Sequence, residues 1–110
     1  MRVLVCGGRN YADTPSVFAT LDEIMPTHVI HGAASGADHI AGMWATARKV
    51  PCTAYPADWR KHGKAAGPIR NQVMLESSKP DLVIAFPGGS GTADMIRRAA
   101  AAGIEVRRVP

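Results

Sequence analysis

Apolar residues gather in five short runs along the chain, and polar or amphipathic stretches separate these runs. The runs Arg2–Cys6 and Asp81–Phe86 are almost continuously apolar, which is typical of strands buried on both faces of a sheet. The other three runs are bounded by proline or glycine, residues that end regular structure. The pattern therefore predicts five strands, at residues 2–6, 27–31, 51–55, 81–86 and 104–109.

The stretches between the runs carry apolar residues at helical spacing. Val17, Leu21 and Ile24 are three or four residues apart, so they share one face of a helix. In a later stretch, Val73 and Met74 are expected to face inward. The spacing predicts four helices in total, over residues 15–25, 37–49, 69–78 and 90–102.

Residues 56–68 contain two prolines and two glycines, which disfavour both helix and strand. The composition predicts a loop with at most one helical turn, around residues 58–61. A loop of this length in a small domain is usually functional or mobile. Trp59 lies in it, and serves there either as a lid that stacks on a ligand or as an anchor of the loop to the domain.

Strands and helices alternate along the chain, which predicts an α/β fold of one domain over residues 1–110. The expected architecture is a Rossmann-like three-layer sandwich with a five-stranded parallel sheet in the order 3-2-1-4-5. In this order the first and fourth strands are neighbours at the topological switch point. Ligands of such folds bind beyond the carboxyl ends of the strands at that point.

Three glycine-rich turns each follow a predicted strand and precede a predicted helix, at residues 6–9, 31–38 and 87–94. Parallel strands place all three at one edge of the sheet, where backbone N–H groups and helix N-termini attract phosphate. No turn matches a Walker A loop or the GxGxxG dinucleotide pattern. The predicted ligand-binding residues are Gly7, Gly8, Arg9, Gly32, Ser35, Gly36, Asp38, Arg70, Asn71, Gly88, Gly89, Ser90, Gly91 and Thr92.

Four side chains near these turns have more than one expected role. Arg9 and Arg70 can each hold a phosphate in two-pronged fashion, or lie exposed on the surface. Asp38 can cap its helix or accept a hydrogen bond from a ribose hydroxyl. Tyr11 can stack on a base, or pack against the first helix.

The charge and the aromatic content of the chain indicate which kind of ligand is expected. The net charge of +4 favours anionic ligands, but it does not choose between a nucleotide and a nucleic acid. The basic run Arg60–Lys64 is either solvated surface or a weak sign of nucleic-acid binding. Sparse aromatic residues, 5% of the chain, make nucleic acid the less favoured partner.

The sequence gives little support for a metal site, a cofactor site or a membrane span. The histidines lack the spacing of metal ligands, and no Gly-x-Ser-x-Gly motif is present, so neither a metal nor another cofactor is expected. Cys6 and Cys52 are expected to be buried at strand positions. No stretch approaches the ~20 apolar residues of a membrane span, so a cytoplasmic protein is expected.

The chain resembles the SLOG superfamily, in particular its YspA-like branch of bacterial and phage proteins. The matching pieces keep their order along the chain; they are residues 7–13, 31–38, 55–59, 67–74 and 85–92. The resemblance implies a Rossmann-like domain that binds a nucleotide or a nucleotide-derived ligand, as a sensor or a processing domain.

The chain is more distantly similar to the Lonely Guy, or lysine-decarboxylase-like, phosphoribohydrolases, which cleave the N-glycosidic bond of nucleoside monophosphates and usually dimerise. Arg70 matches their site arginine, and residues 87–92 match their phosphate turn. Their glutamate falls on Met95, and Asp94 stands one position earlier, about 100° around the helix. The resemblance implies a phosphate site, a homodimer, and a catalytic role for Arg70 with Asp94 or Asp38.

Three hypotheses follow. The leading one is nucleotide binding through the glycine-rich turns. The second is a phosphoribohydrolase. The third is a DNA-binding module, because the superfamily also resembles a DNA-processing protein.

Overall fold

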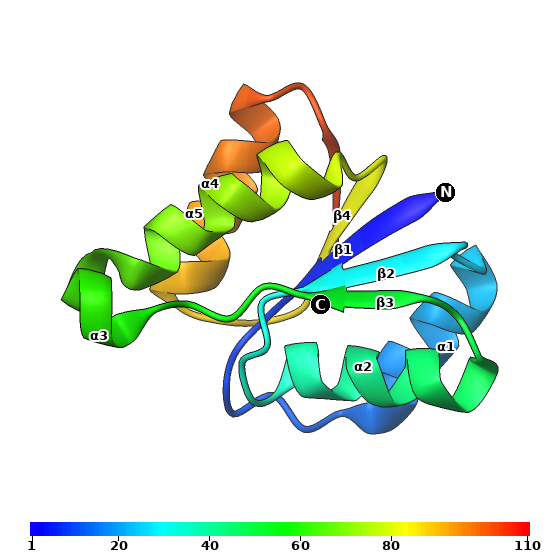
Figure 1. The fold of residues 1–110 in the computed structure, drawn as a ribbon. Coiled ribbons are helices and arrows are strands. Elements are labelled where there is room, and N and C mark those ends of the chain that lie inside the picture. The colour runs from blue at the N-terminus through cyan, green and yellow to red at the C-terminus, as the bar shows by residue number, and fades with distance from the viewer.

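The computed structural model describes residues 1–110 and contains a five-stranded parallel sheet in the order β3-β2-β1-β4-β5. Figure 1 shows the sheet between two layers of helices. The predicted fold class and strand order are confirmed, with β1 and β4 as neighbours at the switch point. The strands are β1 (Arg2–Cys6), β2 (His28–His31), β3 (Cys52–Ala54), β4 (Leu82–Ala85) and β5 (Glu105–Arg108).

Two pairs of helices cover the sheet, one pair on each face (Figure 1). The first pair is α1 (Thr14–Ile24) and α2 (Ala37–Arg48), and the second is α4 (Ala66–Ser78) and α5 (Ser90–Ala101). A short helix α3 (Trp59–His62) and a 3-10 turn η1 (Gly63–Ala65) lead into α4. No helix is both long and apolar enough to cross a bilayer.

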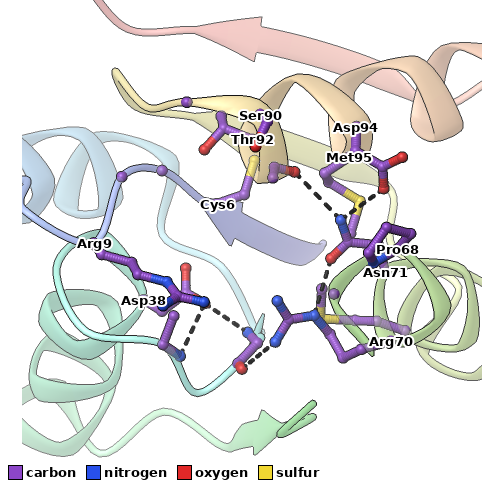
Figure 2. A pocket seen from close by; sticks show the side chains of 18 of the residues that line it. Cys6, Arg9, Asp38, Pro68, Arg70, Asn71, Ser90, Thr92, Asp94 and Met95 are labelled. Atoms are coloured by element: carbon purple, nitrogen blue, oxygen red, sulfur yellow. Dashed lines mark hydrogen bonds between the residues drawn. The ribbon is translucent and has the colours of Figure 1, made fainter. Parts of the chain in front are cut away.

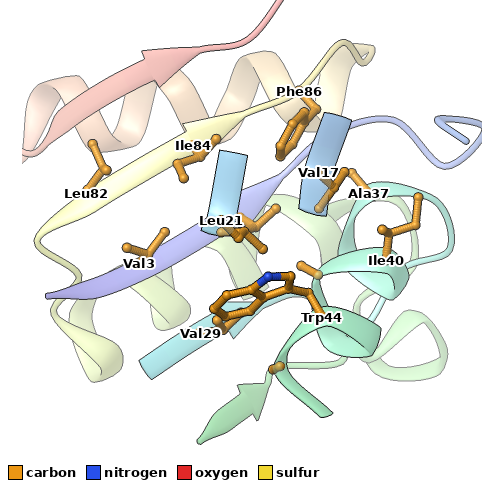
Figure 3. Packing of buried hydrophobic residues seen from close by; sticks show 13 residues of the cluster. Val3, Val17, Leu21, Val29, Ala37, Ile40, Trp44, Leu82, Ile84 and Phe86 are labelled. Carbon is orange, nitrogen blue, oxygen red and sulfur yellow. The ribbon is translucent and has the colours of Figure 1, made fainter. Parts of the chain in front are cut away.

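Side chains of the sheet alternate between two separate cores. In β1, Val3 and Val5 belong to the cluster under α1 and α2, whereas Leu4 and Cys6 belong to the cluster under α4 and α5. Figure 3 shows the first cluster, where the indole of Trp44 is fully enclosed. Each face of the sheet is thus held by its own apolar layer, and the strand ends remain for other contacts.

The prediction of a loop over residues 56–68 was wrong for its second half, which is helical. Asp58 caps α3 by accepting a hydrogen bond from the Lys61 N–H at 3.1 Å, and η1 joins α3 to a helix that starts at Ala66 rather than Ile69. Pro68 is compatible with that start because the first turn of a helix needs no N–H donor there. The segment is therefore ordered structure next to the strand ends.

Two expectations about burial were also wrong. Met74 is buried, but Val73 is 46% exposed because it lies on the outer side of α4. Cys6 is buried, whereas Cys52 is exposed because β3 is an edge strand. The α4 surface therefore carries apolar side chains, Val73 and Ile69, that no element of this chain covers.

Candidate ligand-binding site

The carboxyl ends of the central strands open onto one cavity of about 560 Å³, called the main cavity below. The structure brings all three glycine-rich turns to its edge, together with α3 and the start of α4 (Figure 2). The predicted site residues that line it are Gly7, Gly8, Arg9, Gly32, Asp38, Trp59, Arg70, Asn71, Gly89, Ser90, Gly91, Thr92 and Asp94.

Four predicted residues lie outside the main cavity. Ser35 lines a smaller neighbouring cavity, and its hydroxyl donates to the Arg9 carbonyl at 3.2 Å. Gly88 packs against the hydroxyl of Thr92. The centre of the Tyr11 ring lies 5.3 Å from that of Phe86, so Tyr11 packs against the core cluster through Phe86 and does not line the main cavity.

Gly36, the fourth, is part of a contact that locks the turns together. It has a positive φ of 74°, and a Cβ there would overlap the carbonyl oxygen of Gly8. The same carbonyl accepts the N–H of Ala37 at 3.3 Å, and the Gly8 N–H donates to Pro87 at 2.9 Å. The first turn therefore binds both others directly, which fixes the shape of the cavity edge.

The turn between β4 and α5, residues 87–92, presents unpaired donors. The N–H groups of Gly89, Ser90, Gly91 and Thr92 donate to no acceptor in the chain, and no side chain caps α5. These residues all line the main cavity. The positive end of the α5 dipole lies at the same place. The turn can therefore accept an anion without losing any internal hydrogen bond.

The turn between β2 and α2, residues 32–36, differs because a carboxylate of the chain occupies two of its N–H donors. The Asp38 carboxylate accepts hydrogen bonds from the N–H groups of Gly32, at 3.0 Å, and Ala34, at 3.3 Å. Asp38 is 5% exposed, and burial raises its pKa to about 6, although both donors and Arg70 lower it in part. Asp38 thus organises the turn and does not cap α2.

Arg70 joins α4 to the ends of two strands. Its guanidinium donates to the carbonyl oxygens of Gly32 and Tyr55, the latter at 3.2 Å, and its Nε donates to Asn71 at 3.0 Å. Burial lowers its pKa. It forms no ion pair within the chain, and neither does Arg9, whose guanidinium lies 5.3 Å from the centre of the Trp59 ring.

Asp94 belongs to a polar cluster on the other side of the cavity (Figure 2). Its carboxylate accepts hydrogen bonds from Asn71 at 2.9 Å and from Arg98 at 2.8 Å, and Arg97 lies at 3.3 Å. Burial alone would raise its pKa, but these partners outweigh burial and lower it. Asp94 is therefore a paired carboxylate, poorly suited to donate a proton.

The sequence reasoning missed several wall residues, among them Cys6, Gly67 and Arg97. Burial, and to a lesser degree the charge of Asp38, raises the pKa of the Cys6 thiol to about 12, so it is not a nucleophile here. The i,i+3 spacing of Arg97 from Asp94 could have predicted their ion pair, but not their position at the cavity.

Comparison with known proteins places this chain in a family. The family described as "YspA, cpYpsA-related SLOG family" matches residues 1–62. The chain is also 39% identical to Gene 61 protein of Mycobacterium phage D29 over 117 residues, which covers 96% of this chain and 93% of the phage protein. The chain belongs to the YspA, cpYpsA-related SLOG family.

Two solved structures share the fold of this SLOG protein. DNA processing protein A from Streptococcus pneumoniae matches 99% of the chain with a TM-score of 0.82 and 19% identity. MurG from Acinetobacter baumannii matches 97% of it with a TM-score of 0.58 and 14% identity. The chain spans 50% and 34% of these proteins, respectively. At such low identity the likeness is one of fold.

Proposed function

We propose that this SLOG protein binds a nucleotide or a nucleotide-derived ligand in the main cavity, with a phosphate group on the turn at residues 87–92. One observation carries the proposal: four consecutive residues at the start of α5 line this cavity, and none of their N–H groups has an acceptor in the chain. An anionic ligand supplies those acceptors, and the α5 dipole favours it.

The charges around the cavity support the same ligand class. Arg9 and Arg70 contribute two positive charges that no carboxylate of the chain neutralises through an ion pair. Arg70 is held by backbone carbonyls, so it is oriented before a ligand arrives. Trp59 adds an exposed aromatic face on which a base or sugar can pack.

Isothermal titration with AMP, cyclic nucleotides, ADP-ribose and NAD tests the proposal. At least one of these is expected to bind, and Arg9→Ala is expected to weaken that binding about tenfold, because a charge-assisted hydrogen bond is lost. Arg107→Ala, an exposed arginine of β5, is the matched control and leaves affinity unchanged. Absence of binding at millimolar concentration for all four ligands contradicts the proposal.

A phosphoribohydrolase is a second candidate function. In such an enzyme Asp38 is a better candidate than Asp94 for the residue that transfers a proton. Asp38 lines the main cavity, and its raised pKa of about 6 keeps it able to take up or release a proton near neutral pH. Incubation with nucleoside monophosphates is expected to release free base. If Asp38 transfers the proton, Asp38→Asn abolishes the release of free base, whereas Asp94→Asn only weakens it.

Nucleic-acid binding is a third candidate. It is favoured by the name of DNA processing protein A and by the basic residues of α3 and η1, of which Lys64 lines the main cavity. An oligonucleotide added to the same titration separates this candidate. A steep loss of its affinity with added salt supports nucleic acid over a small ligand.

A homodimer and a cytoplasmic location remain predictions. The exposed apolar side chains Ile69 and Val73 on α4 are a better candidate contact than the alanine-rich α5. Light scattering of the protein and of a Val73→Lys variant tests the dimer, which the added charge is expected to weaken.

A further inference from the structure

A second cavity, called the side cavity below, lies next to the main cavity. Its volume is about 330 Å³, and five residues line both cavities: Arg9, Gly32, Ala34, Trp59 and Arg70. Each cavity by itself reaches the roughly 300 Å³ at which small-molecule sites begin. The shared residues therefore form a junction between two spaces of ligand size.

The junction is positively charged. The positive charge of Arg9 contributes to lowering the pKa of Arg70, after burial, so the two guanidinium groups repel each other. The negative charge of Asp38 raises the pKa of Arg70, but one carboxylate oxygen of Asp38 already accepts hydrogen bonds from backbone N–H groups. A phosphate between Arg9 and Arg70 would remove this repulsion and accept hydrogen bonds from both.

The side cavity differs from the junction because its own walls are uncharged. Apart from the shared residues, Ala33, Ser35, Pro56 and Ala57 line it. Trp59 is 48% exposed and faces both cavities, with the Arg9 guanidinium 5.3 Å from its ring centre. Such walls suit an uncharged polar group, such as a sugar or a nucleoside, more than they suit a phosphate.

We infer that the ligand is a nucleotide whose phosphate is linked to a second, uncharged group, with Arg9 and Arg70 on the linking phosphate and Trp59 against the second group. This inference rests on the proposed function and sharpens it, because it adds the side cavity to the binding site. The class includes dinucleotides joined by a phosphodiester and nucleotide sugars joined by a diphosphate.

The test compares ADP with ADP-ribose, a diphosphate-linked probe, and with the phosphodiester adenylyl-adenosine. At least one linked probe is expected to bind about tenfold tighter than ADP. Trp59→Ala lowers its affinity about 5- to 150-fold, the range for loss of one stacked ring, and lowers that of ADP much less. Trp59→Phe keeps a ring and restores most of the difference.

Tryptophan fluorescence gives an independent readout. Trp44 is 1% exposed and Trp59 is 48% exposed, so a ligand-induced change reports on Trp59. The linked probe is expected to change the emission of the wild-type protein and not that of Trp59→Phe. Circular dichroism of each variant shows whether it has folded.

Three results overturn the inference. If ADP and both linked probes bind equally, or if Trp59→Ala lowers their affinities by the same factor, the side cavity takes no part in binding and the proposed function stands alone. If no nucleotide probe binds, the inference and the proposed function fail together. If a single-stranded oligonucleotide binds and the small probes do not, Trp59 contacts a nucleic acid and the inference is wrong.

Discussion

Two strand–turn–helix units of this protein start from the same sequence pattern and differ in what occupies their donors. In both, a glycine-rich turn follows a buried strand and ends at a helix N-terminus. The carboxylate of Asp38 accepts hydrogen bonds from two N–H groups of the turn after β2, whereas Asp94 pairs with Asn71 and two arginines and accepts none from the turn after β4. An internal carboxylate therefore competes with any anion at the turn after β2, and no such carboxylate occupies the turn after β4.

The same comparison explains the opposite pKa shifts of the two carboxylates. Asp38 gains two backbone hydrogen bonds and some help from Arg70, but burial dominates and raises its pKa to about 6. Asp94 has Arg98, Asn71 and Arg97 as partners, which together overcome burial and lower its pKa. The balance between burial and charged partners therefore decides the direction of each shift: burial prevails at Asp38, and the partners prevail at Asp94.

Gly36→Ala is expected to have the largest effect, because it breaks the turn after β2 without touching a donor. The new Cβ would overlap the Gly8 carbonyl, and the positive φ disfavours alanine. We expect a loss of about 4 kcal/mol in the free energy of unfolding, measured by urea denaturation. Gly89→Ala has open space and a negative φ and is the control. Equal stability of the two variants contradicts this account.

Asp38→Asn tests how much the buried carboxylate of Asp38 lowers the free energy of unfolding near neutral pH. The folded protein binds the Asp38 proton more tightly than the unfolded chain does, so this group contributes stability below about pH 4, which is lost as pH rises to about 6. Asparagine removes that dependence. Relative to wild type, the variant is expected to gain up to about 3 kcal/mol between pH 4 and pH 7 in urea denaturation. A difference that stays constant across this range counts against the raised pKa.

Gly91→Asp converts the open turn into a copy of the closed one, because Gly91, like Asp38, is the second residue of its helix. No atom lies within 4 Å of the Cβ position, so the side chain fits. The carboxylate takes the free donors and repels phosphate, and affinity for the bound nucleotide should fall about 100-fold. Gly91→Asn has the same size without the charge and should lose much less. Similar losses in both variants point to steric exclusion instead.

Asp94→Asn is expected to have the smallest effect and the opposite pH dependence to Asp38→Asn. Asp94 contributes stability that is present above its ordinary pKa of 3.8 and is lost as pH falls through the lower value of the folded state. We expect a loss of about 1 kcal/mol at pH 7, typical of a partly screened ion pair. This loss should shrink below pH 4 in the same denaturation experiment; a pH-independent loss means that packing, not charge, is responsible.

The strand order and the shared edge of the three turns were predicted from the preferred topology of α/β folds. The amino-acid pattern alone predicted the five strands, the apolar positions on both faces of β1 and the glycine-rich turns. These features depend on local periodicity and on glycine and proline, which act over a few neighbouring residues. The sequence also predicted that Arg70 and the turn at residues 87–92 lie near each other, because parallel strands bring their carboxyl ends together, and both line the main cavity.

Which groups of the cavity are free to bind a ligand depends on the folded molecule as a whole. The tertiary structure placed Tyr11 on Phe86, Trp59 at the cavity, and Asp38 on the donors of Gly32 and Ala34. A hydrogen-bond donor is available or satisfied according to the three-dimensional position of acceptors, many of which are distant in the chain. Residue types and their spacing cannot specify that position, so the sequence located the site without showing which of its turns is open.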